Sequence, residues 1–154
     1  MHPCHRTEIG YTLAELVLVS AFLSICAIVA IPRMNTDLLK KYKSQTAAKK
    51  IITDLRLARS LAIQSAASNN SGFALHMTGS PPYRSYRLIN LATDAVISSH
   101  DLDSSLQCTG GTIFNFGPLG NLKAGSDTSL VVSGAGSTTT ITLTAATGMV
   151  SYAK

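Results

Sequence analysis

The stretch Gly10-Tyr11-Thr12-Leu13-Ala14-Glu15-Leu16 places one carboxylate at the start of a long apolar run. No residue between Leu16 and Ile31 is charged, and Pro32 ends the run. A carboxylate in apolar surroundings is unfavourable unless it is paired or becomes neutral. Polar groups inside apolar spans are usually functional, so we interpret Glu15 as a functional residue. The alternative is that Glu15 only marks where the run meets the polar headgroups of a membrane.

The apolar run has the length of a membrane span. Residues 11–31 form a segment of 21 residues, and about 20 apolar residues cross a bilayer as a helix. Ser20, Ser24 and Cys26 interrupt the run with small side chains, which allow helices to pack closely. A secretory signal peptide is the alternative, but Pro32-Arg33-Met34 follows in place of a small-x-small cleavage site. We therefore expect a transmembrane and assembly helix over 11–32.

The same segment resembles the processing site of type IV prepilins and type II secretion pseudopilins, in which a short polar leader and a glycine precede an apolar helix with one glutamate. The resemblance implies that a prepilin peptidase removes the leader, residues 1–10, by cutting between Gly10 and Tyr11. It also implies N-methylation of Tyr11, although phenylalanine is the usual residue there. Glu15 would then recruit the subunit and set its register while the apolar helices polymerise.

Helical geometry gives a physical reason for combining Tyr11 with Glu15. Residues i and i+4 share one helix face, and a helix N-terminus favours a nearby anion. In a bundle of such helices, the Glu15 carboxylate can pair with the amino group of a neighbouring subunit's Tyr11. That pairing offsets the desolvation of the carboxylate and fixes the axial register.

The charges that flank the span disagree with the topology of this family. Arg6 is the only Lys or Arg before the span, whereas Arg33, Lys40, Lys41 and Lys43 follow it. The positive-inside rule alone would leave the C-terminal domain in the cytoplasm. The resemblance implies the opposite: a single-pass protein of the bacterial inner membrane with a cytoplasmic N-terminus. Its C-terminal domain would be periplasmic and would be drawn into a filament.

A second, amphipathic helix is expected within residues 33–71, from Met34 to about Ser68. Pro32 should kink its junction with the span, and Asn69-Asn70-Ser71-Gly72 supplies C-cap residues. The basic residues of this helix form either a solvated face or a patch that contacts partner subunits or a polyanion. The apolar residues recur with a period close to 3.6, at Leu38, Tyr42, Ala48, Ile51, Ile52, Leu55, Ala58, Ala62 and Ala66.

Residues 72–154 change to strand patterns and predict a β-rich periplasmic domain. The apolar stripe of the preceding helix can cover the apolar face of a sheet. We thus predict an α+β, pilin-like fold, in which a long N-terminal helix packs on a C-terminal antiparallel β-sheet domain. The Gly-, Ser- and Thr-rich stretch 125–148 suggests exposed connections. The expected strands are 73–77, 86–91, 112–116, 130–133, 139–144 and 149–152.

Three further segments resemble the GspH/FimT group of minor pilins. They are Ala58-Arg59-Ser60-Leu61-Ala62-Ile63 within 54–63, Phe116-Gly117-Pro118-Leu119-Gly120, and Thr147-Gly148-Met149-Val150. The resemblance implies a GspH-type minor pseudopilin, a structural subunit of a type II secretion pseudopilus. Its partners would be the prepilin peptidase, other pseudopilins or minor pilins, and secreted cargo. The alternative is a FimT-like minor type IV pilin involved in pilus assembly or in DNA binding and uptake.

The sequence shows no catalytic constellation, so we expect neither an enzyme nor a cofactor. His76 and His100 are the only histidines after the leader, and neither has a partner at metal-ligand spacing. His100-Asp101-Leu102-Asp103 has too few oxygen donors for a calcium loop, so we expect a solvated loop and no metal there. Cys108 is the single cysteine of the expected periplasmic domain, which argues against an intrachain disulfide there.

A formal net charge of +5 leaves nucleic acid open as a partner under the FimT-like alternative. DNA-binding relatives of that kind use basic residues near the C-terminus, where this chain has only Lys154. Arg84, Arg87, Lys123 and Lys154 are the candidates for a DNA or partner contact, which requires clustered basic residues. A third hypothesis is a solitary membrane-anchored protein whose N-terminal segment is never processed.

Overall fold

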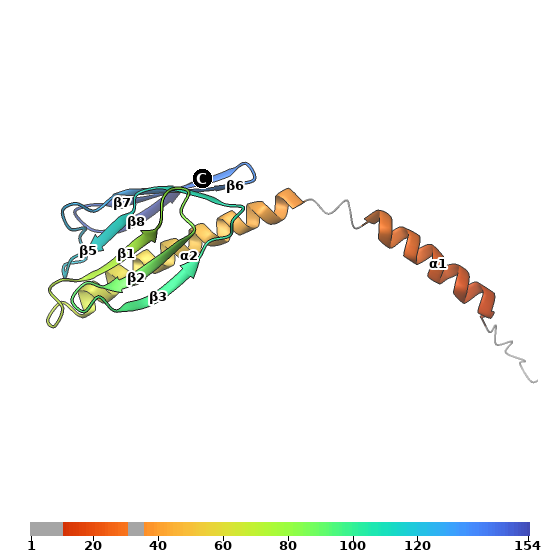
Figure 1. Ribbon diagram of the computed structural model, residues 1–154, viewed down its shortest axis with the longest axis horizontal. Helices are drawn as coiled ribbons and strands as arrows, with labels where there is room; N and C mark the ends of the chain where they lie inside the picture. The colour runs from red at the N-terminus through yellow and green to blue at the C-terminus, as the bar shows by residue number, and fades with distance from the viewer. Residues whose placement is uncertain (1–10, 31–35) are drawn as a thin grey trace, which may run out of the picture. The chain divides into compact units, whose positions relative to one another are not determined.

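The computed structural model describes residues 11–30 and 36–154, which belong to two separate units (Figure 1). Helix α1, Leu13–Ala30, lies in the first unit. The second unit, Thr36–Lys154, contains helix α2 and eight strands. The expected leader 1–10 with the cleavage residue Gly10, and the expected kink residue Pro32, lie outside the described residues.

Helix α1 starts directly after Thr12, whose hydroxyl caps it. The Oγ1 atom of Thr12 accepts the backbone N–H of Glu15 at 3.3 Å, and the Thr12 carbonyl accepts the N–H of Leu16 at 3.2 Å. Threonine at the N-cap and an acid in the first turn both stabilise a helix start. The helix has 18 residues. Among the helices that the structure describes, none combines the length and the apolarity needed to cross a membrane.

Helix α2, Thr36–Gln64, ends earlier than the predicted boundary near Ser68. The polar residues after it serve the following strand. Asn69 accepts the N–H of Gly72 at 2.8 Å, and its amide donates to the Asn90 side chain at 2.8 Å. Gly72 adopts φ +83°, and a Cβ there would collide with the Phe116 carbonyl oxygen. The expected C-cap segment therefore fastens the chain to the sheet instead of extending the helix.

The strands pair in antiparallel fashion, as predicted, but they form two four-stranded sheets where a single sheet was expected. The first sheet, whose strands are all labelled in Figure 1, has the order β3-β2-β1-β5. The second sheet has the order β4-β6-β7-β8. The chain is therefore an α+β protein, with α2 packed on antiparallel sheets. The strands are β1 Phe73–Thr78, β2 Ser85–Asn90, β3 Val96–Asp101, β4 Gln107–Gly110, β5 Ile113–Phe116, β6 Ser129–Gly134, β7 Ser137–Thr144 and β8 Met149–Ala153.

Two strands, β3 and β4, were missed by the sequence patterns. The prediction of a solvated loop over His100–Asp103 was wrong for its first two residues, because His100 and Asp101 complete β3. This strand is polar and mostly exposed, so period-two alternation is weak in it. The stretch 125–148 was also expected to hold exposed connections, yet most of it lies in β6 and β7. Threonine is β-branched and favours strands, which outweighs the polarity of that stretch.

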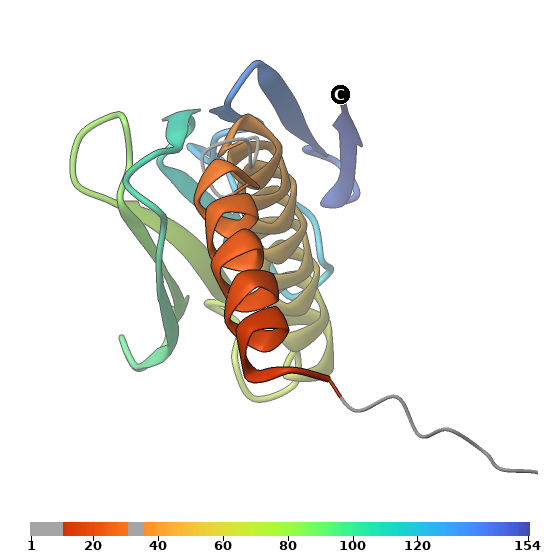
Figure 2. The same cartoon turned by 90° about the vertical axis from the view of Figure 1, so that its right-hand side faces the viewer.

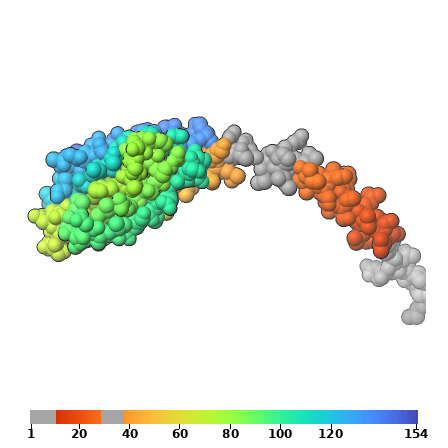
Figure 3. Space-filling model, viewed as in Figure 1, coloured from red at the N-terminus to blue at the C-terminus, as the bar shows by residue number. Residues whose placement is uncertain are grey.

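The core lies along α2, which contacts β1 and β5 of the first sheet and β6, β7 and β8 of the second. Figure 2 shows the strands arranged around this helix, and the strands hide most of it in the space-filling view (Figure 3). Leu38 and Tyr42, which were expected in the apolar stripe, are 53% and 67% exposed. The stripe is buried where the sheets begin, at Ala48, Ile51, Ile52, Leu55, Ala58 and Ala62.

Candidate functional site

The start of α1 brings Tyr11 and Glu15 to one side of the segment, as their spacing predicts. Together with Leu16 and Val19 they line a hollow of about 420 Å³. The Glu15 carboxylate has no hydrogen bond or ion pair within residues 11–30 and 36–154. It is therefore available to a cation from another molecule.

The apolar side chains of α1 are exposed within the unit that the helix forms. Leu13 is 83% exposed and Ile28 is 70% exposed. A continuous apolar surface of this kind is stable when lipid or other apolar helices cover it. The large apolar residues of this surface include Leu13, Leu16, Leu18, Phe22, Ile25 and Ile28.

The basic residues Lys123 and Lys154 lie near opposite ends of α2. The Lys123 ammonium donates to the carbonyl of Ser71, beyond the C-terminal end of the helix, at 3.1 Å. Lys154 lines a small hollow with Lys41, close to the N-terminal end. A helix of 29 residues is about 43 Å long at 1.5 Å per residue. These two lysines therefore do not share one patch.

The arginines of the same predicted set belong to the first sheet. The Arg84 guanidinium donates to the carbonyls of Ser104 at 2.9 Å and Leu106 at 3.1 Å, so it holds the connection between β3 and β4. Arg87 is exposed in the middle of β2, opposite Ser99 of β3. The structure thus does not gather Arg84, Arg87, Lys123 and Lys154 into a single cluster.

The three segments that resemble minor pilins meet in space at Arg59. This helix residue donates from Nε to the Thr147 carbonyl at 2.9 Å and to the Gly120 carbonyl at 3.3 Å. Gly148 adopts φ +61°, and a Cβ there would collide with the Gly120 carbonyl oxygen. The glycines allow this close approach of two turns, and the arginine satisfies their carbonyl groups. Three stretches that are far apart in the sequence therefore meet at one place.

A buried polar cluster that the sequence patterns missed joins α2 to the first sheet. Asp54 is 9% exposed, and its Oδ2 accepts the Tyr86 hydroxyl at 2.6 Å. The His100 Nε2 lies 3.6 Å from the same oxygen. Burial, followed by the hydrogen bond to Asp54, raises the pKa of Tyr86 well above its ordinary value. The available signal was an acid inside the apolar stripe of a helix, beside Leu55.

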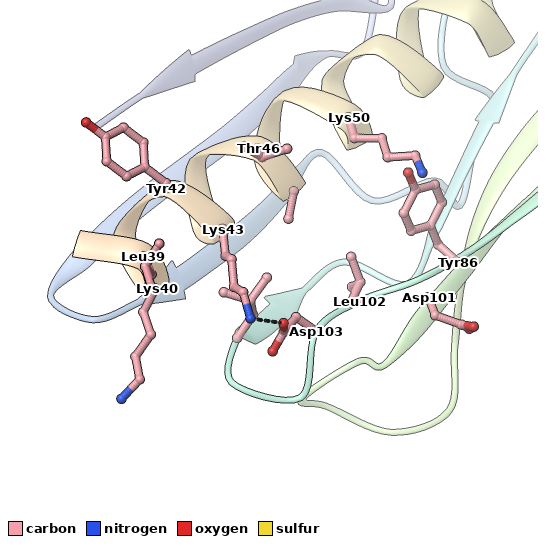
Figure 4. A pocket seen from close by; sticks show the side chains of 12 residues that line it. Leu39, Lys40, Tyr42, Lys43, Thr46, Lys50, Tyr86, Asp101, Leu102 and Asp103 are labelled. Atoms are coloured by element: carbon pink, nitrogen blue, oxygen red, sulfur yellow. Dashed lines mark hydrogen bonds and ion pairs between the residues drawn. The ribbon is translucent and has the colours of Figure 1, made fainter. Parts of the chain in front are cut away.

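An open hollow of about 550 Å³ lies between the first half of α2 and the end of β3 (Figure 4). Its lining includes the apolar side chains of Leu39, Leu102 and Leu106. Lys43 bridges to Asp103 with an Nζ–Oδ2 distance of 2.8 Å. The hydrogen bond from Lys43, followed by those from Ser105, holds the pKa of Asp103 well below its usual range. No histidine, cysteine or serine lines the hollow.

The cysteines and histidines of the described residues form no metal-ligand cluster, and the Cys108 thiol is inaccessible. Within these residues, no group of three or more metal-ligating side chains occurs. Cys108 is fully buried, and burial raises the pKa of its thiol to about 12, which suppresses reactivity. His76 lies 3.3 Å from the Asn115 side chain, measured from Nε2 to Oδ1.

No family model matches the chain, and no curated protein or solved structure matches it either. The case for a function therefore depends on the residues and their geometry.

Proposed function

We propose that the chain is a GspH-type minor pseudopilin, a structural subunit that assembles through its N-terminal helix into a periplasmic filament for protein secretion. The observation that carries the proposal is Glu15. It is the single carboxylate of an apolar helix, it follows the segment Gly10-Tyr11, and it has no partner among the described residues. The convergence of three minor-pilin-like segments at Arg59 supports the same family.

In the proposed mechanism the chain performs no chemical turnover. A prepilin peptidase cuts after Gly10 and methylates the new N-terminus at Tyr11. The Glu15 carboxylate of one subunit then pairs with the N-terminal amine of its neighbour, and an ion pair in apolar surroundings tolerates little displacement. This pairing sets the register, while the exposed apolar side chains of α1 supply the area that is buried between helices.

The proposal includes an inner-membrane stage before assembly. The uncharged run from Leu16 to Ile31 would hold the subunit in the bilayer. The α+β unit would then face the periplasm and present its surface to other subunits or to secreted cargo. The pilin-like arrangement, with the apolar segment and α2 as successive parts of one long helix kinked at Pro32, belongs to this proposal.

A FimT-like minor type IV pilin that binds DNA is the second candidate. The observation that favours it is the lysine-rich first half of α2, where residues 40–50 hold five lysines and no acid. Clustered lysines bind phosphates, and such binding weakens steeply with salt. Salt-dependent binding of duplex DNA by the solubilised full chain would favour this candidate over the secretion role.

The proposed function is tested by processing and assembly of Glu15 variants. Intact mass of the membrane-extracted chain, with and without co-expressed prepilin peptidase, should show loss of residues 1–10 and gain of one methyl group. Glu15→Ala and Glu15→Gln should be processed but should enter filaments at a small fraction of the wild-type level. Ser20→Ala on the same helix is the matched control and should assemble normally.

Two results would contradict the proposal. An unprocessed chain beside an active peptidase would show that Gly10-Tyr11 is not a cleavage site. Normal filament entry of both Glu15 variants would remove the role given to the carboxylate.

A further inference from the structure

The two sheets have four edge strands, and the edge at β5 is closed by the chain itself. Ile113 accepts the backbone N–H of Asp127 at 2.8 Å and donates to the Asp127 carboxylate at 3.0 Å. Asn115 accepts the backbone N–H of Lys123 at 2.9 Å and donates to the Ser126 hydroxyl at 3.2 Å. The outward backbone groups of β5 are thus occupied, and no further strand can be added there.

The edges at β4 and β3 are protected in other ways. The outward carbonyl of Cys108 in β4 accepts the Tyr83 N–H at 2.8 Å, and the carbonyl of Gly110 accepts the Tyr83 hydroxyl at 3.1 Å. Strand β3 carries a bulge at Ile97, because the pairing of β2 with β3 skips this residue. Asp101 adds an exposed charge at the end of that strand. Bulges and charges are the usual protection of edge strands.

Strand β8 lacks each of these protections. It pairs with β7 in an unbroken register over its five residues. It contains no charged residue and no proline, and Met149 and Tyr152 are 60% and 50% exposed. In the topology it is the last strand of the second sheet, beyond β7. An edge of this kind is a template for another strand.

The outward-facing backbone groups of β8 can be identified from the ladder. Leu143 of β7 donates its N–H to Thr128, on the side of β6. Polar backbone groups alternate along a strand, so those of Thr142 point toward its partner Ser151 in β8. The N–H and C=O groups of Val150 and Tyr152 therefore point away from β7. Within residues 11–30 and 36–154, no hydrogen bond outside the strand ladder reaches them.

Positive charge gathers at the C-terminal end of this open edge. Lys154 follows β8, and it lines a hollow of about 400 Å³ with Lys41 and Gln45 of α2. Ser137 and Thr138 of β7 contribute to the same hollow, and no acid does. A carboxylate at the end of an added strand would meet these two lysines.

We propose that β8 is a strand-addition site for an extended segment of another protein that carries an acidic residue beside Lys41 and Lys154. The added strand pairs with the backbone groups of Val150 and Tyr152, and about five residues match the length of β8. A second copy of this chain fits less well, because each copy carries a net charge of +5. The inference does not depend on processing or assembly of α1.

The experiment uses the detergent-solubilised full chain and two acetylated peptides of alternating threonine and valine, one ending in aspartate and one ending in lysine. The aspartate peptide should slow hydrogen exchange of the amides in β8 and should bind at least about tenfold more tightly than the lysine peptide. Lys41→Glu should remove or invert this preference.

Tyr152→Pro tests the backbone contact directly. Proline removes the outward N–H and leaves the ladder to β7 intact, so binding should fall at least about tenfold while the melting temperature stays close to wild type. Tyr152→Thr is the matched control, because it removes the ring and keeps the N–H, and it should bind about as well as wild type. Absence of binding by both peptides, protection at β3 in place of β8, or concentration-dependent self-pairing through β8 would overturn the proposal.

Discussion

Glu15 and Asp54 are both carboxylates within the apolar surface of a helix, but their surroundings differ. Asp54 is buried, accepts the Tyr86 hydroxyl and lies beside His100. Glu15 is exposed, and its carboxylate has no partner among the described residues. The Asp54 carboxylate thus has its hydrogen-bond partner within the chain, whereas the Glu15 carboxylate has none among the described residues. The carboxylate without a partner is the better candidate for a functional contact.

The apolar residues around these two acids show the same contrast. Leu55, next to Asp54, is completely buried in the core that α2 shares with the sheets. Leu18, on the helix of Glu15, is 69% exposed. Helix α2 is therefore stabilised by contacts within its own unit, whereas the apolar side chains of α1 are exposed.

The largest expected effect comes from truncating one leucine in each helix. Leu55→Ala should destabilise the α+β unit by about 2–5 kcal/mol, because it opens a cavity in the packed core. Leu18→Ala should leave the unfolding of that unit unchanged, because Leu18 belongs to the other unit. Chemical denaturation of the solubilised chain, followed by circular dichroism, measures both. Equal destabilisation by the two substitutions would mean that α1 packs against the α+β unit.

The sequence was most informative where a periodic pattern and burial coincide. The helix stripe around Ile51 and Leu55 and the strand at 139–144 were predicted correctly, because in both cases one face is buried against a neighbour. The patterns failed for β3, whose residues face solvent and whose pairing is set by β2.

Contacts between distant segments were less accessible from the sequence. The clustering of Asp54 with Tyr86 and His100 depends on how α2 crosses the first sheet, and no local spacing encodes that crossing. The Arg59 contacts with Gly120 and Thr147 likewise join residues far apart in the chain. The predicted basic set failed to form one cluster for the same reason, since sequence alone did not reveal that Lys123 and Lys154 lie near opposite ends of α2.

A smaller effect is expected from removing a tyrosine hydroxyl group. The loss of stability should be greater at Tyr86, which donates to the Asp54 carboxylate, than at the buried Tyr83. Tyr86→Phe leaves a buried carboxylate without its hydroxyl donor and should cost about 1.5–3 kcal/mol of unfolding free energy. Tyr83→Phe is the matched control, because its hydroxyl binds the neutral groups Gly110 and Thr112. It should cost about 0.5–1.5 kcal/mol. Equal shifts of the two denaturation curves would mean that the hydrogen bond from Tyr86 to the Asp54 carboxylate contributes no more stability than the hydrogen bonds of Tyr83 to neutral groups.

The smallest effect concerns Asp103, a carboxylate that is only partly buried but is paired, as Asp54 is. Its hydrogen bonds from Lys43 and Ser105 lower its pKa in the folded chain. A lowered folded pKa means that the stabilisation is present above the unfolded pKa, roughly 4, and is lost as pH falls through the folded value. Asp103→Asn should therefore lower the melting temperature slightly at neutral pH, and this difference should vanish in strong acid. Lys43→Gln should reproduce most of the shift, and high salt should reduce it. A difference that persists undiminished in strong acid would mean that Asp103 acts through its shape and not through its charge.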